Sequence, residues 1–379
     1  MNYALSCLAV SLAATTTAQT FVVDASNGPG TNFTSIATAV AAVPDGAALQ
    51  VRGGSYGSFT IDNKSLAVLG GPGVVIDDLP GTVEVRNLSS QRRVVIRNLE
   101  VRSPVVVGTI RCDTNLGAVL IEQCVSPLAN GTGCQFRASQ SAQVWLVDSE
   151  FNMGLNGAIL TMDNSRVSMV RVTCPRAQGS SPWNFRISGG VTELIDCDIR
   201  TVPLPAAIGT PIQLVATSTM RLLGTTRIDN NVIPGLFGPA FSGAGTVLLD
   251  PTVQIVSAAP AFSPSTTVIP RAMPSLRARS APLGSVQAAE LRGPANGVGG
   301  LVAGLPAGPT QIAPFAELWF IDPANFVVMG GGSLGSPLTG SYAVPTNPAL
   351  LATVIAWQGW CHDPTTGFQA SNAVLVAHW

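Results

Sequence analysis

The sequence predicts an all-β protein in which a parallel β-solenoid with an N-terminal capping helix is followed by a small β-sandwich. The chain has 379 residues, of which 39 are glycine and 28 are proline, so many short strands joined by tight turns fit it better than long helices do. Short apolar segments recur at a steady interval between about residues 50 and 255, which predicts the solenoid. Beyond a Pro- and Ser-rich stretch, alternating segments continue without that interval, which predicts the sandwich.

Six apolar segments define the repeat, and their start-to-start spacings are 25, 25, 23, 25 and 28 residues. They begin at Val94, Val119, Val144, Val167, Thr192 and Met220. The first and third positions are apolar in nearly every case, which predicts a strand with one face inward. The fifth position of the first five segments is polar and predicts an outward corner, occupied by Asn98, Gln123, Asp148, Arg171 and Asp196. A strand, a corner, a second strand and a long return make one coil of a parallel β-solenoid.

A short amphipathic helix before the first coil is predicted to cover the open end of the solenoid. Four apolar residues fall on one face of this helix: Phe33, Ile36, Val40 and Val43. Its N-cap is expected at Thr31 or Asn32. A cap is physically required, because an uncovered end would expose unpaired strand edges.

Two segments near the start of the chain resemble a known family. The strings "FTSIATAVAAVPDG" (33–46) and "VRGGSY" (51–56) are similar to the start of pectinesterases, and the repeat region resembles the right-handed parallel β-helix proteins of the pectin-lyase-like group. The resemblance covers roughly residues 21–260 and implies a right-handed parallel β-helix, which we place at residues 21–257. It implies the fold rather than the reaction, because such segments recur in β-helix proteins without esterase activity.

Residues 1–18 are predicted to be a secretory signal peptide, because an apolar run is followed by small residues and a cleavage position after Ala18. We therefore expect a secreted or cell-surface protein. No later stretch approaches about 18 consecutive apolar residues, so no transmembrane helix is expected. The net charge of -1 predicts no general attraction to nucleic acid. A monomer is expected.

The C-terminal part of the chain has a different pattern. Residues 258–285 are rich in proline and serine and are predicted to be a linker, and residues 286–379 are predicted to form a β-sandwich-like domain. The last segment resembles a C-terminal module that follows β-helices in secreted bacterial proteins, and the resemblance implies no activity. The matching positions are Gln358, Asp363, Pro364, Gly367, Phe368, Ser371 and Asn372.

The catalytic motifs of the resembled enzyme families are absent from the sequence. Pectinesterases place catalytic aspartates in QDT and DF segments, and neither string occurs. Pectate lyases use an R-x-P-x-x-R motif, which begins here at Arg102 but ends on Val107. Polygalacturonases need a histidine in the solenoid, whereas His362 and His378 lie beyond it. These absences favour a protein without enzymatic activity.

Two carboxylate pairs remain as candidate catalytic groups. Asp148 and Glu150 lie two residues apart, and Asp196 and Asp198 repeat that spacing two coils later. Glycoside cleavage needs two carboxyl groups about 5–9.5 Å apart. The alternative, which is favoured, is a charge ladder in which Asp148, Arg171 and Asp196 stack at the corners of successive coils and neutralise one another.

An arginine-rich segment supplies candidate ligand-binding residues. Residues 86–111 contain six arginines and one acid, Glu100. The candidates within this segment are Arg93, Arg97, Arg102 and Arg111. Guanidinium groups match carboxylate and sulfate groups, so this patch could bind an acidic polysaccharide or another cell-envelope glycan. The alternative, a solvated surface in a chain that has a single lysine, is favoured.

Tryptophan and cysteine carry weaker signals. Four tryptophans of the C-terminal part could stack on sugar rings, although a role in the core is favoured: Trp319, Trp357, Trp360 and Trp379. Cys112 and Cys134 are 22 residues apart, about one coil, and form a candidate disulfide. No CxxC motif or His-rich cluster suggests a metal, and no cofactor is expected.

Together these patterns predict an extracellular or cell-surface module that binds a ligand or has a structural role, with glycans as the favoured ligand class. The ligand class follows from the resemblance and from the arginine patch. The alternative is a polysaccharide lyase or glycoside hydrolase with a non-standard carboxylate site.

Overall fold

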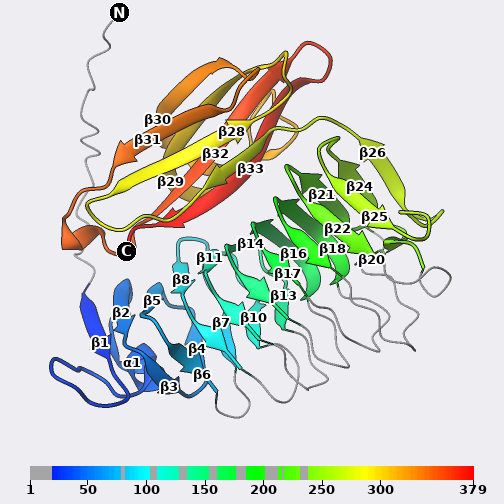
Figure 1. Cartoon of the computed structure of the whole chain (residues 1–379). Coiled ribbons are helices and arrows are strands. Elements are labelled where there is room, and N and C mark those ends of the chain that lie inside the picture. The colour runs from blue at the N-terminus through cyan, green and yellow to red at the C-terminus, as the bar shows by residue number, and fades with distance from the viewer. Residues whose placement is uncertain are drawn as a thin grey trace, which may run out of the picture.

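The computed structural model describes residues 19–77, 82–102, 109–127, 135–152, 160–175, 185–200, 212–215, 217–230 and 238–379. Within these ranges the chain is almost entirely β-strand, with one short α-helix and one 3-10 turn, η1 (Pro348–Leu350). A parallel β-solenoid of about eight coils is followed by antiparallel sheets (Figure 1). The predicted fold class is therefore confirmed.

Each coil contributes strands to three stacks. The first stack comprises β4 (Phe59–Asp62), β7 (Val83–Arg86), β10 (Ile110–Asp113), β13 (Phe136–Ser139), the first halves of β16 (Leu160–Val170) and β18 (Phe185–Ile195), β20 (Ile212–Val215) and β23 (Phe241–Gly243). The second comprises β1 (Thr20–Val23), β2 (Ala47–Val51), β5 (Leu66–Gly70), β8 (Arg93–Arg97), β11 (Ala118–Glu122), β14 (Gln143–Val147), the second halves of β16 and β18, β21 (Thr219–Leu223), β24 (Thr246–Leu249) and β26 (Thr267–Pro270). The third comprises β3 (Gly54–Tyr56), β6 (Val74–Ile76), β9 (Glu100–Val101), β12 (Val125–Ser126), β15 (Glu150–Phe151), β17 (Thr173–Cys174), β19 (Asp198–Arg200), β22 (Arg227–Asn230) and β25 (Gln254–Ser257).

The register places equivalent positions of successive coils side by side. Val119 pairs with Val94 on one side and with Val144 on the other. These inward positions are almost fully buried and join one core cluster that runs the length of the solenoid. The predicted inward face of the repeat is therefore confirmed.

The predicted corner residues all have left-handed backbone conformation. Their φ angles are 56°, 53°, 47°, 53° and 55°, for Asn98, Gln123, Asp148, Arg171 and Asp196 respectively. A positive φ turns the chain sharply between the second and third stacks, and a short polar side chain tolerates it best. Asn98 also donates a hydrogen bond from Nδ2 to the carbonyl of Gly70 in the preceding coil, at 2.9 Å. Polar residues recur at this position because of the turn.

The N-terminal end of the solenoid is covered by α1 (Ile36–Ala42), which buries Ile36, Ala39 and Val40. Its N-cap is Ser35, whose hydroxyl accepts from the backbone N–H of Thr38. The expectation of a cap at Thr31 or Asn32 was wrong by about one turn. Asn32 instead accepts from the backbone N–H of Val22 in the first strand, and so fixes the loop before the helix.

The C-terminal part is a sandwich of two antiparallel sheets. The three-stranded sheet has the order β27 (Ser275–Ala278), β28 (Val286–Arg292), β31 (Leu338–Ala343). The four-stranded sheet has the order β30 (Leu318–Ser333), β29 (Val298–Gln311), β32 (Val354–Asp363), β33 (Gly367–Ala377). Tyr342 of one sheet stacks on the fully buried Trp357 of the other, with ring centroids 5.9 Å apart. The segment expected as a linker, 258–285, contains β26 of the solenoid and β27 of the sandwich.

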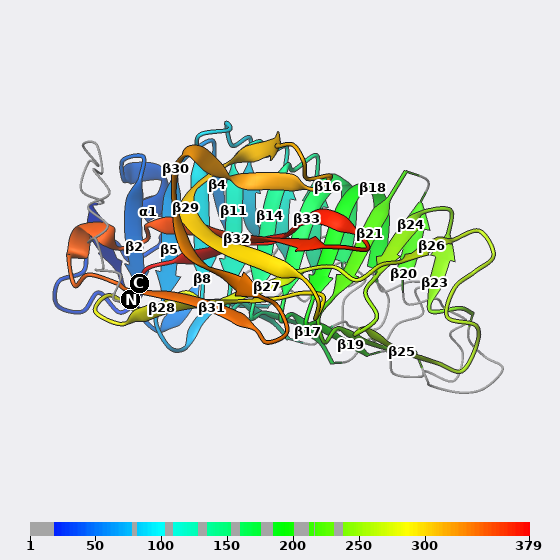
Figure 2. The ribbon, with the colours of Figure 1, turned by 90° about the horizontal axis from the view of Figure 1, so that it is seen from above.

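The sandwich lies along the second stack of the solenoid, with β32 and β33 running along the solenoid axis (Figure 2). Outward side chains of the second stack and side chains of the sandwich form one continuous apolar cluster. At its centre Trp145 meets Phe320 edge-on at 5.7 Å and donates from Nε1 to the carbonyl of Ala373 at 3.0 Å. Strands β11 and β14 in the middle of this stack are thus buried on both faces, unlike β10 of the first stack.

Candidate functional site

An interdomain groove of about 660 Å³ runs between the solenoid corners and the three-stranded sheet of the sandwich. The solenoid contributes Arg171, Asp196 and Thr225, and the sandwich contributes residues of β27, β28 and β31. This volume lies within the range of sites that hold small ligands. The groove brings charged and hydroxyl-bearing side chains of both parts of the chain together, and we take it as the candidate site.

Strand alternation explains how the groove is built. Arg277 and Arg279 are two residues apart around β27, so both point to the same face of the three-stranded sheet. Next to them on that face are short side chains of β28 and β31: Ala288, Thr339 and Ser341. Small side chains here leave space between the sheet and the solenoid corners.

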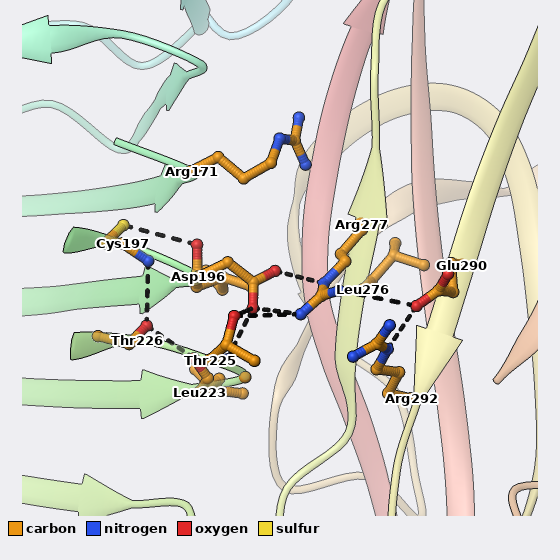
Figure 3. A network of polar contacts seen from close by, with 12 residues as sticks. Arg171, Asp196, Cys197, Leu223, Thr225, Thr226, Leu276, Arg277, Glu290 and Arg292 are labelled. Carbon is orange, nitrogen blue, oxygen red and sulfur yellow. Dashed lines mark hydrogen bonds and ion pairs between the residues drawn. The ribbon is translucent and has the colours of Figure 1, made fainter. Parts of the chain in front are cut away.

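Asp196 is the main link between the two walls. Its Oδ1 accepts from the backbone N–H of Thr225 at 2.7 Å and from the Thr225 hydroxyl at 2.9 Å. Arg277 reaches across from β27 and donates from Nη2 to the same oxygen at 2.5 Å (Figure 3). The Arg277 Nη1 also lies 3.8 Å from Glu290 Oε1 of the sandwich. Arg277 is therefore held between one carboxylate of each domain.

The equivalent corner of the next coil is occupied by Gly224. Gly224 has a φ of 62°, and a Cβ there would lie 2.4 Å from Asp196 Oδ1. A side chain at this position would displace the carboxylate from Thr225 and Arg277. The glycine thus keeps Asp196 in the geometry that holds the sandwich.

Arg171 makes a second link one coil away. It donates from Nε and Nη2 to the two oxygens of Asp148, at 2.6 and 2.9 Å, and from Nη2 to the carbonyl of Ala278 at 2.8 Å. Arg279 approaches Asp148 only at 3.7 Å, and its side chain is 73% exposed. Of these arginines, Arg279 is therefore the one whose guanidinium faces solvent at the groove.

In the structure, the two members of each predicted carboxylate pair occupy different positions and have different partners. Asp148 and Asp196 occupy corners and bind Arg171 and Arg277, whereas Glu150 and Asp198 lie on the outward face of the third stack. Asp198 forms an ion pair with Arg200 at 2.5 Å, and Glu150 accepts from the amide of Asn152 at 2.5 Å. The expected Asp148–Arg171 step of the charge ladder is present, but Asp196 is paired with Arg277 of the sandwich. These contacts favour structural roles, because a catalytic acid needs a carboxyl group that is free to exchange a proton.

The four predicted ligand-binding arginines lie on three different faces. Arg93 and Arg97 are on β8 beneath the sandwich, and Arg93 donates to the carbonyl of Pro306 at 2.8 Å. Arg102 follows β9 on the third stack and pairs with Glu100 at 2.5 Å. Arg111 is on the first stack and pairs with Asp113 at 2.8 Å. Arg93 and Arg97 thus share one strand but bond to different partners, and Arg102 and Arg111 lie on the other two stacks.

Arg97 belongs to a buried ion pair at the domain interface. Its Nε lies 3.2 Å from Glu122 Oε2, and the Trp379 ring covers its guanidinium at 3.7 Å. Burial raises the pKa of Glu122 and lowers the pKa of Arg97, and their mutual attraction opposes both changes. The pair is enclosed between the two domains, so its position indicates a role in docking the sandwich.

Among the residues described, the remaining candidate cysteines and histidines do not line the groove. Cys112 is buried in the solenoid core, while Cys134 lies outside the described residues. His378 is buried and bonds through Nε2 to the Tyr342 hydroxyl at 2.8 Å, and burial lowers the pKa of its imidazole. No group of three or more His, Cys, Asp or Glu suited to a metal ion occurs among the residues described. Those residues also include no helix long and apolar enough to cross a membrane.

Comparison with known proteins assigns the chain to no family. No family model matches the chain, and no curated protein matches it. One solved structure is similar: a chitinase of Paenibacillus sp. str. FPU-7, described as bacterial cell-surface-expressed multi-modular enzyme machinery. The identity is 10% and the TM-score is 0.16, and the match covers 86% of this chain but 24% of the chitinase chain. The protein is thus a parallel β-solenoid that carries a C-terminal β-sandwich.

Proposed function

We propose that the protein is an extracellular or cell-surface module that binds an acidic polysaccharide in the interdomain groove. The observation that carries this proposal is the position of Arg279. Its side chain is 73% exposed at the edge of a groove lined by hydroxyl-bearing side chains. This pairing of a solvent-facing cation with sugar-compatible hydroxyls favours a charged glycan.

The groove chemistry suits a uronate or sulfated sugar. A guanidinium can donate two parallel hydrogen bonds to a carboxylate or sulfate group. Thr225, Thr339 and Ser341 carry hydroxyls that can donate to or accept from the hydroxyls of a sugar. Arg171 and Arg277 are already paired with Asp148 and Asp196, so their charges are largely neutralised and their guanidinium groups are occupied. Arg279 is then the group that contacts the acidic substituent.

Binding is favoured over cleavage because the groove acids already have partners. Asp196 accepts three hydrogen bonds from Thr225 and Arg277. Glu290 accepts from Arg292 and lies near Arg277. The oxygens that bond to these partners are occupied within the protein and are not directed at a ligand in the groove.

The test compares Arg279→Gln with Arg102→Gln, an exposed arginine on the third stack away from the groove. Affinity for polygalacturonate and for a sulfated polysaccharide would be measured by isothermal titration calorimetry at two salt concentrations. Arg279→Gln should lower the affinity about tenfold and reduce its salt dependence, because charge-assisted hydrogen bonds contribute roughly 1.5–3 kcal/mol. Arg102→Gln should bind like the wild type. Equal affinities for the wild type and Arg279→Gln would overturn the proposal.

A further inference from the structure

A second surface lies on the sandwich, away from the interdomain groove. Four rings gather on the outward face of the four-stranded sheet and at the loop beside it, and we call them the aromatic patch: Phe315, Trp360, His362 and Phe368. Phe368 is at its centre, with ring centroids 4.5 Å from His362, 6.1 Å from Phe315 and 6.3 Å from Trp360. None of these side chains is an acid, a lysine or an arginine. The patch is thus a group of rings without a fixed charge.

Strand alternation places the patch opposite the sandwich core. On β32, Trp357 and Cys361 are fully buried, with Trp357 stacked on Tyr342 of the other sheet. Trp360 and His362 are only partly buried, and His362 is paired with Phe368 on β33. The Phe368 side chain is 42% exposed, so the patch is open to solvent. It adjoins the domain interface through Phe315, which stacks on the buried Trp319 at 5.6 Å.

A glycine allows the Trp360 indole to pack closely against the neighbouring strand. Gly300 on β29 is the cross-strand partner of Trp360. A Cβ at Gly300 would lie 2.5 Å from the indole Nε1 and 2.7 Å from Cε2. The ring therefore lies against the backbone of β29, which a larger residue would prevent. An indole that packs against a strand backbone is a rigid stacking surface that loses little entropy when a ligand binds.

We propose that the aromatic patch binds an uncharged polysaccharide by stacking against the apolar C–H faces of its sugar rings. Exposed rings grouped on a flat sheet mark an interaction site more often than isolated ones do. The four rings carry no fixed charge, and the carboxylate beside them, Glu317, is paired with Arg271 at 3.3 Å, which matches an uncharged sugar. The imidazole nitrogens of His362 can bond to a sugar hydroxyl. The neighbouring Val298, 50% exposed and paired with His362, extends the apolar surface across the sheet. This site differs from the groove in ligand class and does not depend on it.

The sequence offers a matched control. Phe326 lies on β30 of the same sheet and is 44% exposed, and the described residues show no ring stacked on it. Replacing Phe326 or Phe368 by alanine removes the same group at the same exposure. Only Phe368→Ala removes the centre of the aromatic patch.

The experiment measures co-sedimentation of the whole protein with insoluble cellulose, chitin and β-mannan at high salt, where charge-dependent binding is screened. The wild type should bind at least one of them, Phe368→Ala should bind about tenfold more weakly, and Phe326→Ala should bind like the wild type. Gly300→Ala should also weaken binding, because it displaces the indole. Arg279→Gln should have no effect here, so failure of this proposal and failure of groove binding are distinguishable.

Three results would overturn the proposal. The first is that the wild type binds none of the uncharged polysaccharides. The second is that Phe368→Ala and Phe326→Ala bind equally well. The third is concentration-dependent dimerisation that Phe368→Ala abolishes, in the absence of sugar binding, which would assign the patch to a second copy of the chain.

Discussion

At the residue scale, Asp196 both forms a corner of the solenoid and binds the sandwich. Asp196 turns the chain with a φ of 55° and also accepts hydrogen bonds from Thr225 and Arg277. Its side chain is 7% exposed, although the corner faces outward from the solenoid. The sandwich buries this corner, so a residue that belongs to the turn also becomes part of the domain interface.

Asp196→Asn should therefore destabilise the protein by about 1–3 kcal/mol, since a buried ion pair loses its charge and Arg277 loses its closest partner. The control variant is Asp198→Asn, two residues along the chain, which loses an exposed ion pair with Arg200. Its unfolding free energy should fall by about 0.5 kcal/mol or less. Urea unfolding followed by tryptophan fluorescence measures both. An equal loss of unfolding free energy in the two variants would show that the Asp196–Arg277 ion pair does not stabilise the contact between the solenoid and the sandwich.

At the element scale, strands of the first and second stacks of the solenoid differ in how their residues are buried. First-stack strands such as β10 alternate buried and partly exposed residues, whereas β11 and β14 in the second stack are buried at every position. A parallel strand covered on both faces reads as a continuous apolar run. The runs "AVLIE" and "QVWLV" carry that signal, so the sequence contains a sign that something covers this face. It contains no sign that the C-terminal sandwich is the cover, because that depends on contacts between residues more than 200 positions apart.

The sandwich boundary was harder to predict for a related reason. Residues 258–285 are rich in proline and serine, which suggests a linker, yet β26 and β27 lie within this segment. Arg277 and Arg279 alternate with buried Leu276 and Ala278, which is the pattern of a half-buried strand. Four residues are too few for this alternation to stand out against their surroundings.

Trp145→Ala tests whether the second stack needs its cover. The indole is buried between the domains, so its removal should cost about 3–5 kcal/mol of unfolding free energy through the lost contacts and the cavity. Leu116→Ala, at a solenoid side chain that is 61% exposed, should cost far less. Chemical unfolding compares the two variants, and similar small losses would contradict the docking of the sandwich on this stack.

At the scale of the whole molecule, the solenoid explains why the site was only partly predictable. One coil takes about 25 residues and faces three directions, so arginines that are neighbours in the sequence, such as Arg97, Arg102 and Arg111, lie on different faces. Residues one coil apart meet instead, which is why the repeat predicted the stacking of Asp148 and Arg171. The groove joins Asp196 to Arg277, which are 81 positions apart, and no periodicity connects them.

We propose that the interdomain groove binds an acidic glycan without cleaving it. The most direct measurement incubates the whole protein with polygalacturonate and assays bound protein and new chain ends in the same mixture. Binding should weaken with added salt and with Arg279→Gln, and no new chain ends should appear. New chain ends, or binding that is unchanged in Arg279→Gln, would contradict it.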